Sequence, residues 1–339
     1  MNRDTLIEAK NLSVRYPLGR SMFGAKAFLN AVDNVSLSIR KGSFFGLVGE
    51  SGSGKTTLGR ALLKAAPISE GEVTYHDGEK GFDLNGLKGA ALKDYRKRAQ
   101  LIFQDPYAAL SPRMTVRDII AEPLEVMGIT RNRAETDARV REIAAKCRLN
   151  LEHLRRFPHA FSGGQRQRIS IARALVSGPR FIVADESVAA LDVSIQADVL
   201  NLLKQIQKDM GIGFLFISHD LSVVAHVCDE VAVLYLGQIV ETAPTRQLFA
   251  RPRHPYTSAL LSAIPALDPD APKTAEKLEG EIPSPANPPP GCKFHTRCRF
   301  ARAECKTTVP ALREIAPGHR AACHFAEEFD FTRSAAASA

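Results

Sequence analysis

A glycine-rich loop near residue 50 has the residue types that bind phosphate. Residues 49–56 read Gly-Glu-Ser-Gly-Ser-Gly-Lys-Thr and match the pattern GxxxxGK[ST] at every position. Glycines let the backbone curl so that several N–H groups face phosphate oxygens, and the N-terminus of a following helix adds partial positive charge. Lys55 can then reach the β- and γ-phosphates, and Thr56 can offer its hydroxyl to Mg²⁺. The loop predicts a nucleoside triphosphate site rather than a chance glycine turn.

A pair of acids follows a second apolar run and has the chemistry of a hydrolytic site. Residues 181–184 read Phe-Ile-Val-Ala, which is typical of a buried strand, and Asp185 and Glu186 come directly after them. The first carboxylate can hold Mg²⁺, usually through water. The second can polarise an attacking water as a general base. Paired surface acids are the alternative, and the apolar run before them argues against it.

The phosphate loop alone does not name a function, because GTPases, kinases and motors share it. Residues 161–165, Phe-Ser-Gly-Gly-Gln, resemble the signature sequence of ATP-binding-cassette (ABC) ATPases, with Phe161 in the place of the usual Leu. They precede a predicted helix over 165–175, so they would present N–H groups and the Ser162 hydroxyl at a helix N-terminus. A plain glycine-rich helix cap is the alternative. The resemblance implies that this signature contacts the γ-phosphate of a nucleotide held by the opposite subunit.

Further positions match the same family. Gln104 resembles the Q-loop glutamine, His219 the switch histidine that contacts the γ-phosphate, and Tyr16 the aromatic residue that stacks on adenine. A polar strand end, a structural histidine and a packing tyrosine are the respective alternatives. Residues 189–192, Ala-Ala-Leu-Asp, resemble the D-loop, with Ala189 where Ser is familiar. One hydroxyl across the subunit interface is therefore missing.

The resemblance implies a complete set of site residues for ATP and Mg²⁺. The catalytic residues are Glu186, His219 and Gln104, and the Mg²⁺ residues are Thr56, Gln104 and Asp185. The ATP-binding residues are Tyr16, Gly49, Glu50, Ser51, Gly52, Ser53, Gly54, Lys55, Thr56, Thr57, Gln104, Asp185, Ser162, Gly163, Gly164 and Gln165. Since one cassette is present and an active site needs two, the working unit is expected to be a dimer.

Strand and helix patterns predict an α/β fold. Buried strands are expected near 44–49, 181–184 and 213–218, and 194–210 is an amphipathic helix with Ile195, Val199, Leu202, Leu203 and Ile206 on one stripe. This alternation favours a mostly parallel sheet covered on both faces. The resemblance covers about residues 5–260 and implies the ABC-type P-loop fold, which has an antiparallel N-terminal β-subdomain and a helical subdomain at about 106–170. We expect this nucleotide-binding domain to span residues 5–264.

Composition changes after residue 264, where prolines interrupt any regular structure. We expect a proline-rich linker over 265–291, a small cysteine-containing module over 292–325 and a tail over 326–339. The last six residues of that tail are expected to be disordered.

Four cysteines lie in the C-terminal module with the spacing C-x5-C-x6-C-x17-C, which is not the C-x2-C pairing of common zinc sites. They are Cys292, Cys298, Cys305 and Cys323. Four thiolates can hold Zn²⁺ or a [4Fe–4S] cluster, and nearby Arg297, Arg299 and Arg302 would favour thiolates. The family resemblance favours a structural [4Fe–4S] cluster over zinc or free thiols. Cys147 and Cys228 have apolar helical surroundings and are expected in the core.

Three further stretches narrow the class. The ATPase subunits of bacterial dipeptide, oligopeptide and nickel importers are similar in three places: residues 192–196, residues 236–241 followed by 253–261, and residues 279–285 followed by 291–298. The implied partners are a sister ABC ATPase in a heterodimer, two transmembrane permeases and an extracytoplasmic substrate-binding protein. The implied location is peripheral, on the cytoplasmic face of the inner membrane. The cargo stays open among dipeptides, longer peptides, glutathione-like compounds and nickel.

Composition agrees with a soluble globular subunit. The chain has 339 residues, a net charge of +8 spread along its length, and no uninterrupted apolar stretch of the roughly 18 to 20 residues that a spanning helix needs. The N-terminus lacks an apolar signal region. The rival hypothesis is a soluble ABC ATPase that acts on nucleic acid or the ribosome. Such relatives carry two cassettes or long insertions, which this sequence lacks, so no nucleic acid partner is expected.

Overall fold

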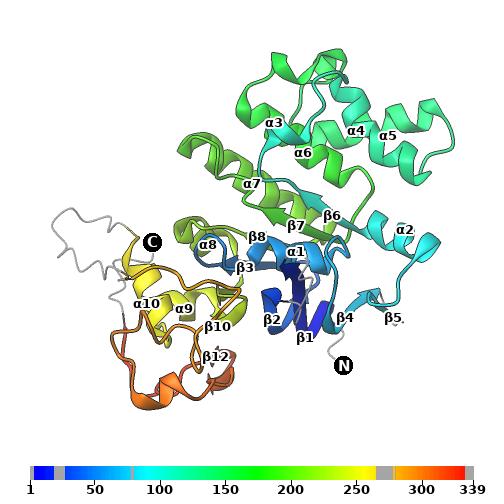
Figure 1. The fold of residues 1–339 in the computed structure, drawn as a ribbon. Helices are drawn as coiled ribbons and strands as arrows, with labels where there is room; N and C mark the ends of the chain where they lie inside the picture. The colour runs from blue at the N-terminus through cyan, green and yellow to red at the C-terminus, as the bar shows by residue number, and fades with distance from the viewer. Residues whose placement is uncertain (1–3, 19–26, 78–79, 265–277, 279, 333–339) are drawn as a thin grey trace. The chain divides into compact units, whose positions relative to one another are not determined.

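Strands and helices alternate along most of the chain in this computed structural model (Figure 1). The residues that the structure describes are 4–18, 27–77, 80–264, 278 and 280–332. The chain divides into a first unit of residues 1–7, 39–44 and 75–217, and a second unit of residues 8–38, 45–74 and 218–339. Most of the predicted proline-rich linker, and the tail beyond 332, lie outside the described residues.

The first unit contains three parallel strands at its centre. They are β6 (Ala99–Ile102), β7 (Phe181–Asp185) and β8 (Gly213–Ile217). Every residue of β7 and β8 is buried, as their unbroken apolar runs predict for strands covered on both faces. Asp185 pairs in register with Ile217, so the acid pair lies at the carboxyl edge of the strands. That edge is where open α/β sheets bind ligands.

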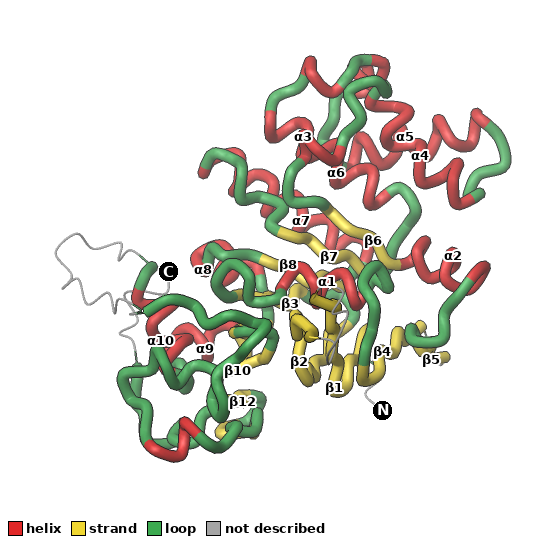
Figure 2. The backbone as a smooth tube through the Cα atoms, in the orientation of Figure 1, coloured by secondary structure: helices red, strands yellow, loops and turns green. Residues whose placement is uncertain are grey.

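Helices make up the rest of the first unit (Figure 2). They are α2 (Gly89–Arg98), α3 (Pro106–Ala109), α4 (Val116–Met127), α5 (Arg133–Lys146), α6 (Gly163–Leu175) and α7 (Val193–Met210), with 3₁₀ turns at Leu151–Arg155 and Pro158–Ala160. The short strand β5 (Lys80–Asp83) also lies here. Helix α7 buries Val199, Leu200, Leu202, Leu203 and Ile206, which confirms the predicted amphipathic stripe, although Ile195 is only half-buried.

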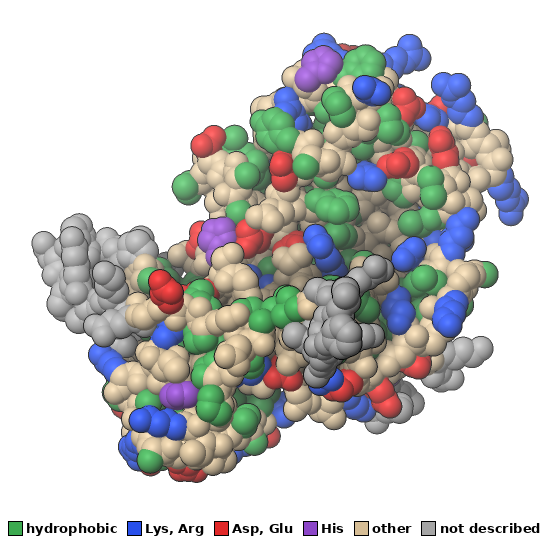
Figure 3. All heavy atoms as spheres, in the orientation of Figure 1, with side chains coloured by type: hydrophobic (Ala, Val, Ile, Leu, Met, Phe, Trp, Pro, Cys, Tyr) green, Lys and Arg blue, Asp and Glu red, His purple; other side chains and the backbone are tan. Residues whose placement is uncertain are grey.

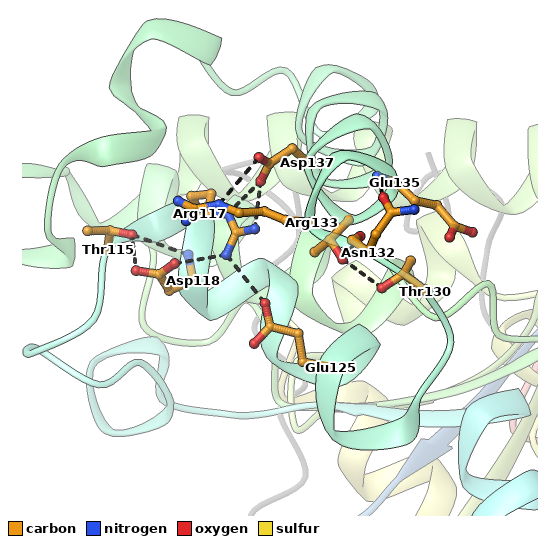
Figure 4. Close-up of polar contacts among 10 residues, drawn as sticks. Thr115, Arg117, Asp118, Glu125, Thr130, Asn132, Arg133, Glu135 and Asp137 are labelled. Atoms are coloured by element: carbon orange, nitrogen blue, oxygen red, sulfur yellow. Dashed lines mark hydrogen bonds and ion pairs between the residues drawn. The ribbon is translucent and has the colours of Figure 1, made fainter.

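Helices α4 and α5 are joined by a cluster of charged side chains (Figure 4). The Arg117 guanidinium lies 2.6 Å from Asp137, 3.1 Å from Asp118 and 3.4 Å from Glu125. Thr115 caps α4 by accepting a hydrogen bond from the Asp118 N–H. Because these carboxylates are substantially exposed, each ion pair adds little stability. Only the contact with Asp137 links the two helices, because Asp118 and Glu125 lie on α4 together with Arg117.

The second unit contains the strand that enters the phosphate loop. Its sheet order is β11 (Arg313–Ala316), β12 (His319–Ala321), β10 (Gln238–Pro244), β9 (Glu230–Tyr235) and β3 (Phe44–Val48). Strands β3 and β9 are parallel, and the other pairs are antiparallel. The helices are α1 (Lys55–Leu62), α8 (Leu221–Val227), α9 (Thr245–Ala250) and α10 (Pro255–Ser262), and a 3₁₀ turn spans Ala303–Lys306. Strands β2 (Ala27–Arg40), β1 (Thr5–Leu18) and β4 (Glu70–Asp77) are neighbours in a separate sheet.

A buried carboxylate ties the C-terminal segment to this sheet. Glu241 on β10 has no exposed area. Its oxygens accept hydrogen bonds from the backbone N–H groups of Arg253 (2.7 Å) and His254 (2.9 Å), and one lies 2.7 Å from His319 Nε2 on β12. Composition alone suggests a separate C-terminal module, whereas the structure joins this segment to the same sheet. The domain boundaries themselves stay predictions.

The remaining core agrees with the expected pattern. Cys147 and Cys228 are both buried, as predicted, and burial raises the pKa of the Cys147 thiol to about 12. No helix in the described part of the chain combines the length and apolar character that a membrane span requires.

Replacing Glu241 with Ala should destabilise the chain by about 3 kcal/mol or more, because two backbone N–H groups and His319 would lose a buried charged partner. The free energy of unfolding, measured by chemical denaturation, checks this. The matched control Glu281→Ala removes an exposed carboxylate and should change stability by less than about 0.5 kcal/mol. Equal effects of the two substitutions would contradict the role given to Glu241.

Candidate active site

The phosphate loop has a backbone shape that only glycine permits at two positions. Gly49 has φ 150°, and a Cβ there would lie 2.2 Å from the Leu234 carbonyl oxygen. Gly54 has φ 103°, and its Cβ would lie 2.1 Å from the Ala31 carbonyl oxygen. Both contacts are with backbone, which cannot give way. The loop therefore curls between β3 and α1 as the sequence pattern predicts.

Lys55, the first residue of α1, points back over the loop. Its side chain is buried, and Nζ donates hydrogen bonds to the carbonyl oxygens of Gly49 (2.7 Å) and Glu50 (2.9 Å). The buried Ser53 hydroxyl in the same loop has no hydrogen-bond partner among the described residues. A buried cation, a hydroxyl without a hydrogen-bond partner and the N-terminus of α1 together fit a polyphosphate.

His219 lies next to the strand that enters the loop. The Ser218 N–H donates to the Leu47 carbonyl of β3 (3.2 Å), and the Asp220 side chain caps α8 by accepting from the Ser222 N–H (2.9 Å). The residues on both sides of the histidine are thus fixed, while the His219 side chain is exposed. Tyr16, near the end of β1, is half-buried, and its stacking on adenine stays a prediction.

In the first unit, the structure brings Gln104 and Glu186 together. Gln104 Nε2 donates to Glu186 Oε2 at 2.8 Å, although the two residues are 82 apart in sequence. Glu186 has φ 46°, a left-handed conformation that costs a non-glycine residue about 1–3 kcal/mol and is typical of functional sites. Its N–H donates to the Ile217 carbonyl (2.9 Å), which holds the strained residue in place. An amide thus orients a carboxylate beside the buried Asp185.

The signature residues begin helix α6. The Ser162 hydroxyl accepts from the Gln165 N–H (3.4 Å), and the Gln165 side chain accepts from the Ser162 N–H (3.1 Å), which is a capping box. A Cβ at Gly164 would lie 2.4 Å from Ile195 Cγ2 on α7, so packing requires glycine there. The S-x-x-Q spacing of residues 162–165 is the sequence signal that could have predicted this capping role of Gln165. In the D-loop, Ala189 is exposed and Asp192 precedes α7 as its N-cap residue.

The structure does not confirm a metal site at the four C-terminal cysteines. Among the described residues, no group of three or more His, Cys, Asp or Glu side chains could hold a metal ion. Neither the predicted [4Fe–4S] ligand set nor a zinc site is confirmed. Burial above all, with a contribution from the other thiols of the segment, raises the pKa of Cys298 to about 11 and of Cys323 to about 12. The four thiols are therefore close enough to influence one another electrostatically.

Sequence reasoning missed the contacts that surround Glu50. The Tyr256 hydroxyl on α10 accepts a hydrogen bond from the Glu50 N–H (2.9 Å). The Arg297 guanidinium donates hydrogen bonds to both carboxylate oxygens of Glu50 (2.6 and 3.0 Å). These partners are more than 200 residues away in the chain, and no local pattern marks them.

Two family models match the chain. The model of the ABC transporter family matches residues 32–189, and the model of the oligopeptide/dipeptide transporter C-terminal region matches residues 240–305.

Relatives match over nearly the whole chain. BOV_A0347 of Brucella ovis, whose name describes a peptide import ATP-binding protein, is 52% identical over 94% of this chain and 98% of its own length. The oligopeptide transport ATP-binding protein AppF of Bacillus subtilis is 46% identical over 95% of this chain and 98% of its own. The dipeptide transport ATP-binding protein DppF of Escherichia coli is 45% identical over 94% and 93%.

Solved structures share the fold of this chain. A dimeric structure of the ATP-binding cassette MJ0796 in a post-hydrolysis state, bound to ADP and Pi, has a TM-score of 0.62 at 28% identity. It covers 71% of this chain and 99% of its own. The predicted ABC-type P-loop fold is thereby confirmed.

Substituting Glu186 with Gln should lower kcat for ATP hydrolysis by about 100-fold or more, since general-base catalysis typically contributes at least that factor. ATP binding should persist, because the phosphate loop is untouched. Phosphate release and nucleotide binding measure the two effects. The exposed acid Glu152 provides the matched control, Glu152→Gln, which should hydrolyse ATP at the wild-type rate. Undiminished hydrolysis by the Glu186→Gln variant would exclude Glu186 as the base.

Proposed function

We infer that this chain, which belongs to the ATP-binding proteins of ABC transporters and to their oligopeptide/dipeptide branch, hydrolyses ATP to drive peptide import across the cytoplasmic membrane. One observation carries this inference. The chain combines an ABC cassette with the C-terminal region typical of oligopeptide and dipeptide transporters, and peptide-import relatives match it nearly end to end.

Phosphate binding and activation of the attacking water are assigned to different residues. In the second unit the loop N–H groups and Lys55 would bind the phosphates, and His219 would contact the γ-phosphate. In the first unit Glu186 would accept a proton from the attacking water, with its carboxylate oriented by Gln104. Thr56, Gln104 and Asp185 would hold Mg²⁺. When bound, that ion neutralises charge that develops on the β- and γ-oxygens.

Two cassettes are needed for a complete site. We propose that Ser162 and the glycines after it contact the nucleotide of a second subunit, since the N-terminus of α6 presents N–H groups to an anion. A sister ABC ATPase in a heterodimer is the proposed partner. The dimeric form of the structurally similar cassette MJ0796 supports a two-cassette arrangement.

A groove in the first unit is the proposed docking site for a permease. Its lining includes Phe103 at the end of β6, Val126 on α4 and Arg173 on α6. Phe103 and Val126 are 43% and 68% exposed, which is unusual for large apolar side chains. The guanidinium of Arg173 bonds Glu122 at 2.7 Å and so forms a polar rim. An apolar groove with a polar rim fits a short amphipathic helix of a membrane protein.

The remaining proposed partners are a second permease and an extracytoplasmic substrate-binding protein, with the chain peripheral to the cytoplasmic face of the inner membrane. The rival function on nucleic acid gains no support from the face drawn in Figure 3. Basic and acidic side chains are interspersed over the face drawn in Figure 3, without the basic stripe that binds a phosphate backbone.

Deletion of the chain from its native cell should abolish uptake of labelled dipeptides or oligopeptides, and the wild-type chain should restore it.

In the same deleted cells, the Val126→Glu variant should give an uptake rate at least about tenfold below that of the wild-type chain, because a charge would enter the apolar groove. Its ATP binding should stay unchanged. Val309→Glu, on an exposed apolar residue of the second unit, is the matched control. Uptake that survives the deletion would contradict the peptide-import function, and full uptake with Val126→Glu would contradict the docking site.

We further propose that Cys292, Cys298, Cys305 and Cys323 bind a [4Fe–4S] cluster. Their mutual electrostatic influence and their shared segment support this, and so does the family resemblance. Backbone bonding brings two of them together, since the Cys292 N–H donates to the Cys305 carbonyl at 2.8 Å. The cluster would supply a cross-link for a segment with little regular structure.

Protein purified without oxygen should contain about four iron and four sulfide per chain. Cys298→Ser should lose most of the iron, whereas Cys147→Ala, at a buried cysteine outside the segment, should keep it. Chemical analysis of iron, zinc and sulfide distinguishes the outcomes. Zinc without sulfide would replace the cluster with a zinc site, and absence of both would leave free thiols.

A further inference from the structure

Glu50, the second residue of the phosphate loop, is held on three sides. Its N–H donates to the Tyr256 hydroxyl (2.9 Å), and its carbonyl oxygen accepts from Lys55 Nζ (2.9 Å). Its carboxylate accepts two hydrogen bonds from the Arg297 guanidinium, at 2.6 and 3.0 Å. Two of these three partners come from the C-terminal part of the chain. The loop is therefore positioned by residues far outside its own motif.

The pair between Glu50 and Arg297 is strong because it is bidentate and shielded from water. The Arg297 side chain is 4% exposed and that of Glu50 24% exposed. Paired hydrogen bonds between a guanidinium and a carboxylate are among the strongest in proteins and fix orientation as well as distance. Hydrogen bonding to Glu50 raises the pKa of Arg297, so the guanidinium keeps its charge.

The segment that carries Arg297 is firmly attached behind the loop. Lys293 Nζ lies 2.7 Å from Asp33 and donates to the Leu236 carbonyl at 2.9 Å. The Phe294 ring packs 5.3 Å from the rings of both Tyr235 and Tyr256. The chain from 292 to 298 thus holds Arg297 from both sides, with a cysteine at each end. The position of the guanidinium depends on the fold of this segment.

A carboxylate in this loop is an electrostatic problem for a polyphosphate site. Without a partner, the Glu50 charge would repel the phosphates, and its shielding from water would make that repulsion stronger than at an open surface. The guanidinium of Arg297 cancels this charge and keeps the carboxylate turned toward the C-terminal segment. The Tyr256 hydroxyl fixes the backbone of the same residue.

We propose that Arg297 is a positioning residue for ATP binding, and that it couples the fold of the cysteine segment to the affinity of the phosphate loop by neutralising and orienting Glu50. The proposal rests on the proposed function only in that the loop binds ATP. It does not depend on the cargo, the permeases or the content of the cysteine segment. It also gives the C-terminal segment a role in the nucleotide site of its own chain.

The test measures the dissociation constant of ATP for the full chain, and KM and kcat for ATP in the assembled transporter. Arg297→Gln should weaken ATP binding about tenfold, which corresponds to about 1.4 kcal/mol, and raise KM with little change in kcat. Arg297→Lys, which keeps the charge, should stay within about threefold of wild type. The double variant Arg297→Gln/Glu50→Gln, which removes both charges, should bind ATP more tightly than Arg297→Gln does. Arg313→Gln breaks the Arg313–Glu327 pair in the same segment and is the matched control.

Each outcome decides the proposal. Wild-type affinity in a folded Arg297→Gln variant would overturn it. A double variant as weak as Arg297→Gln would also overturn it, since the effect would then be steric rather than electrostatic. Thermal melting identifies variants that fail to fold. If Arg297→Gln is unfolded, a double variant that folds and binds ATP supports charge compensation, and a double variant that does not bind ATP refutes it. A wild-type chain that binds ATP without supporting peptide uptake would contradict the proposed function and leave this inference intact.

Discussion

The tight turn between strand β3 and helix α1 is the constraint around which the second unit is organised. Backbone N–H groups can point inward at a phosphate only if the chain curls through conformations that favour glycine. At Gly49 and Gly54 the curl brings the backbone against the carbonyls of Leu234 and Ala31, so strands β9 and β2 shape the loop from outside. A buried strand and a helix N-terminus must therefore be fixed before the loop has its function.

The proposed catalytic acid in the first unit shows a comparable dependence on its surroundings. Glu186 adopts a strained left-handed backbone, and it keeps this conformation because its N–H is bonded to Ile217 of the adjacent parallel strand. The strand before it is fully buried, which fixes where Asp185 ends. Strain of this kind persists only where packing over-determines the backbone. Burial of β7 and β8 thus supplies the rigidity that the acid pair requires.

The C-terminal segment contains little regular secondary structure (Figure 2), yet it is tied to the second unit by buried polar contacts. Glu241 joins it to strand β10, and Arg297 joins it to the phosphate loop. Both residues are charged and shielded from water, so leaving either one without its partner would cost much free energy. Such pairs therefore fix the position of the segment more strictly than apolar contacts would. A segment too small for a core of its own is thereby held in one arrangement.

Much of the fold could be predicted from the sequence because its signals are local, and the candidate site residues rest on signals of the same kind. Glycine spacing at 49–54, the apolar runs before Lys55 and Asp185, and the helical stripe of α7 each depend on neighbours a few residues apart. The sequence also identified the family, since the motifs of residues 161–165 and 279–298 are specific to it. A family resemblance and four cysteines did not suffice to place a metal site, because ligand geometry depends on how the segment packs.

The contacts between distant residues were decided only by the tertiary structure. The pairing of Gln104 with Glu186 spans 82 residues, and that of Arg297 with Glu50 spans 247. A sequence pattern carries no record of such pairs, because a side chain finds a distant partner only after strands and helices have packed. The requirement for glycine at position 164 has the same origin, since it comes from Ile195 on another helix. Residue types and spacing thus determined which chemistry is available, and packing determined which groups position it.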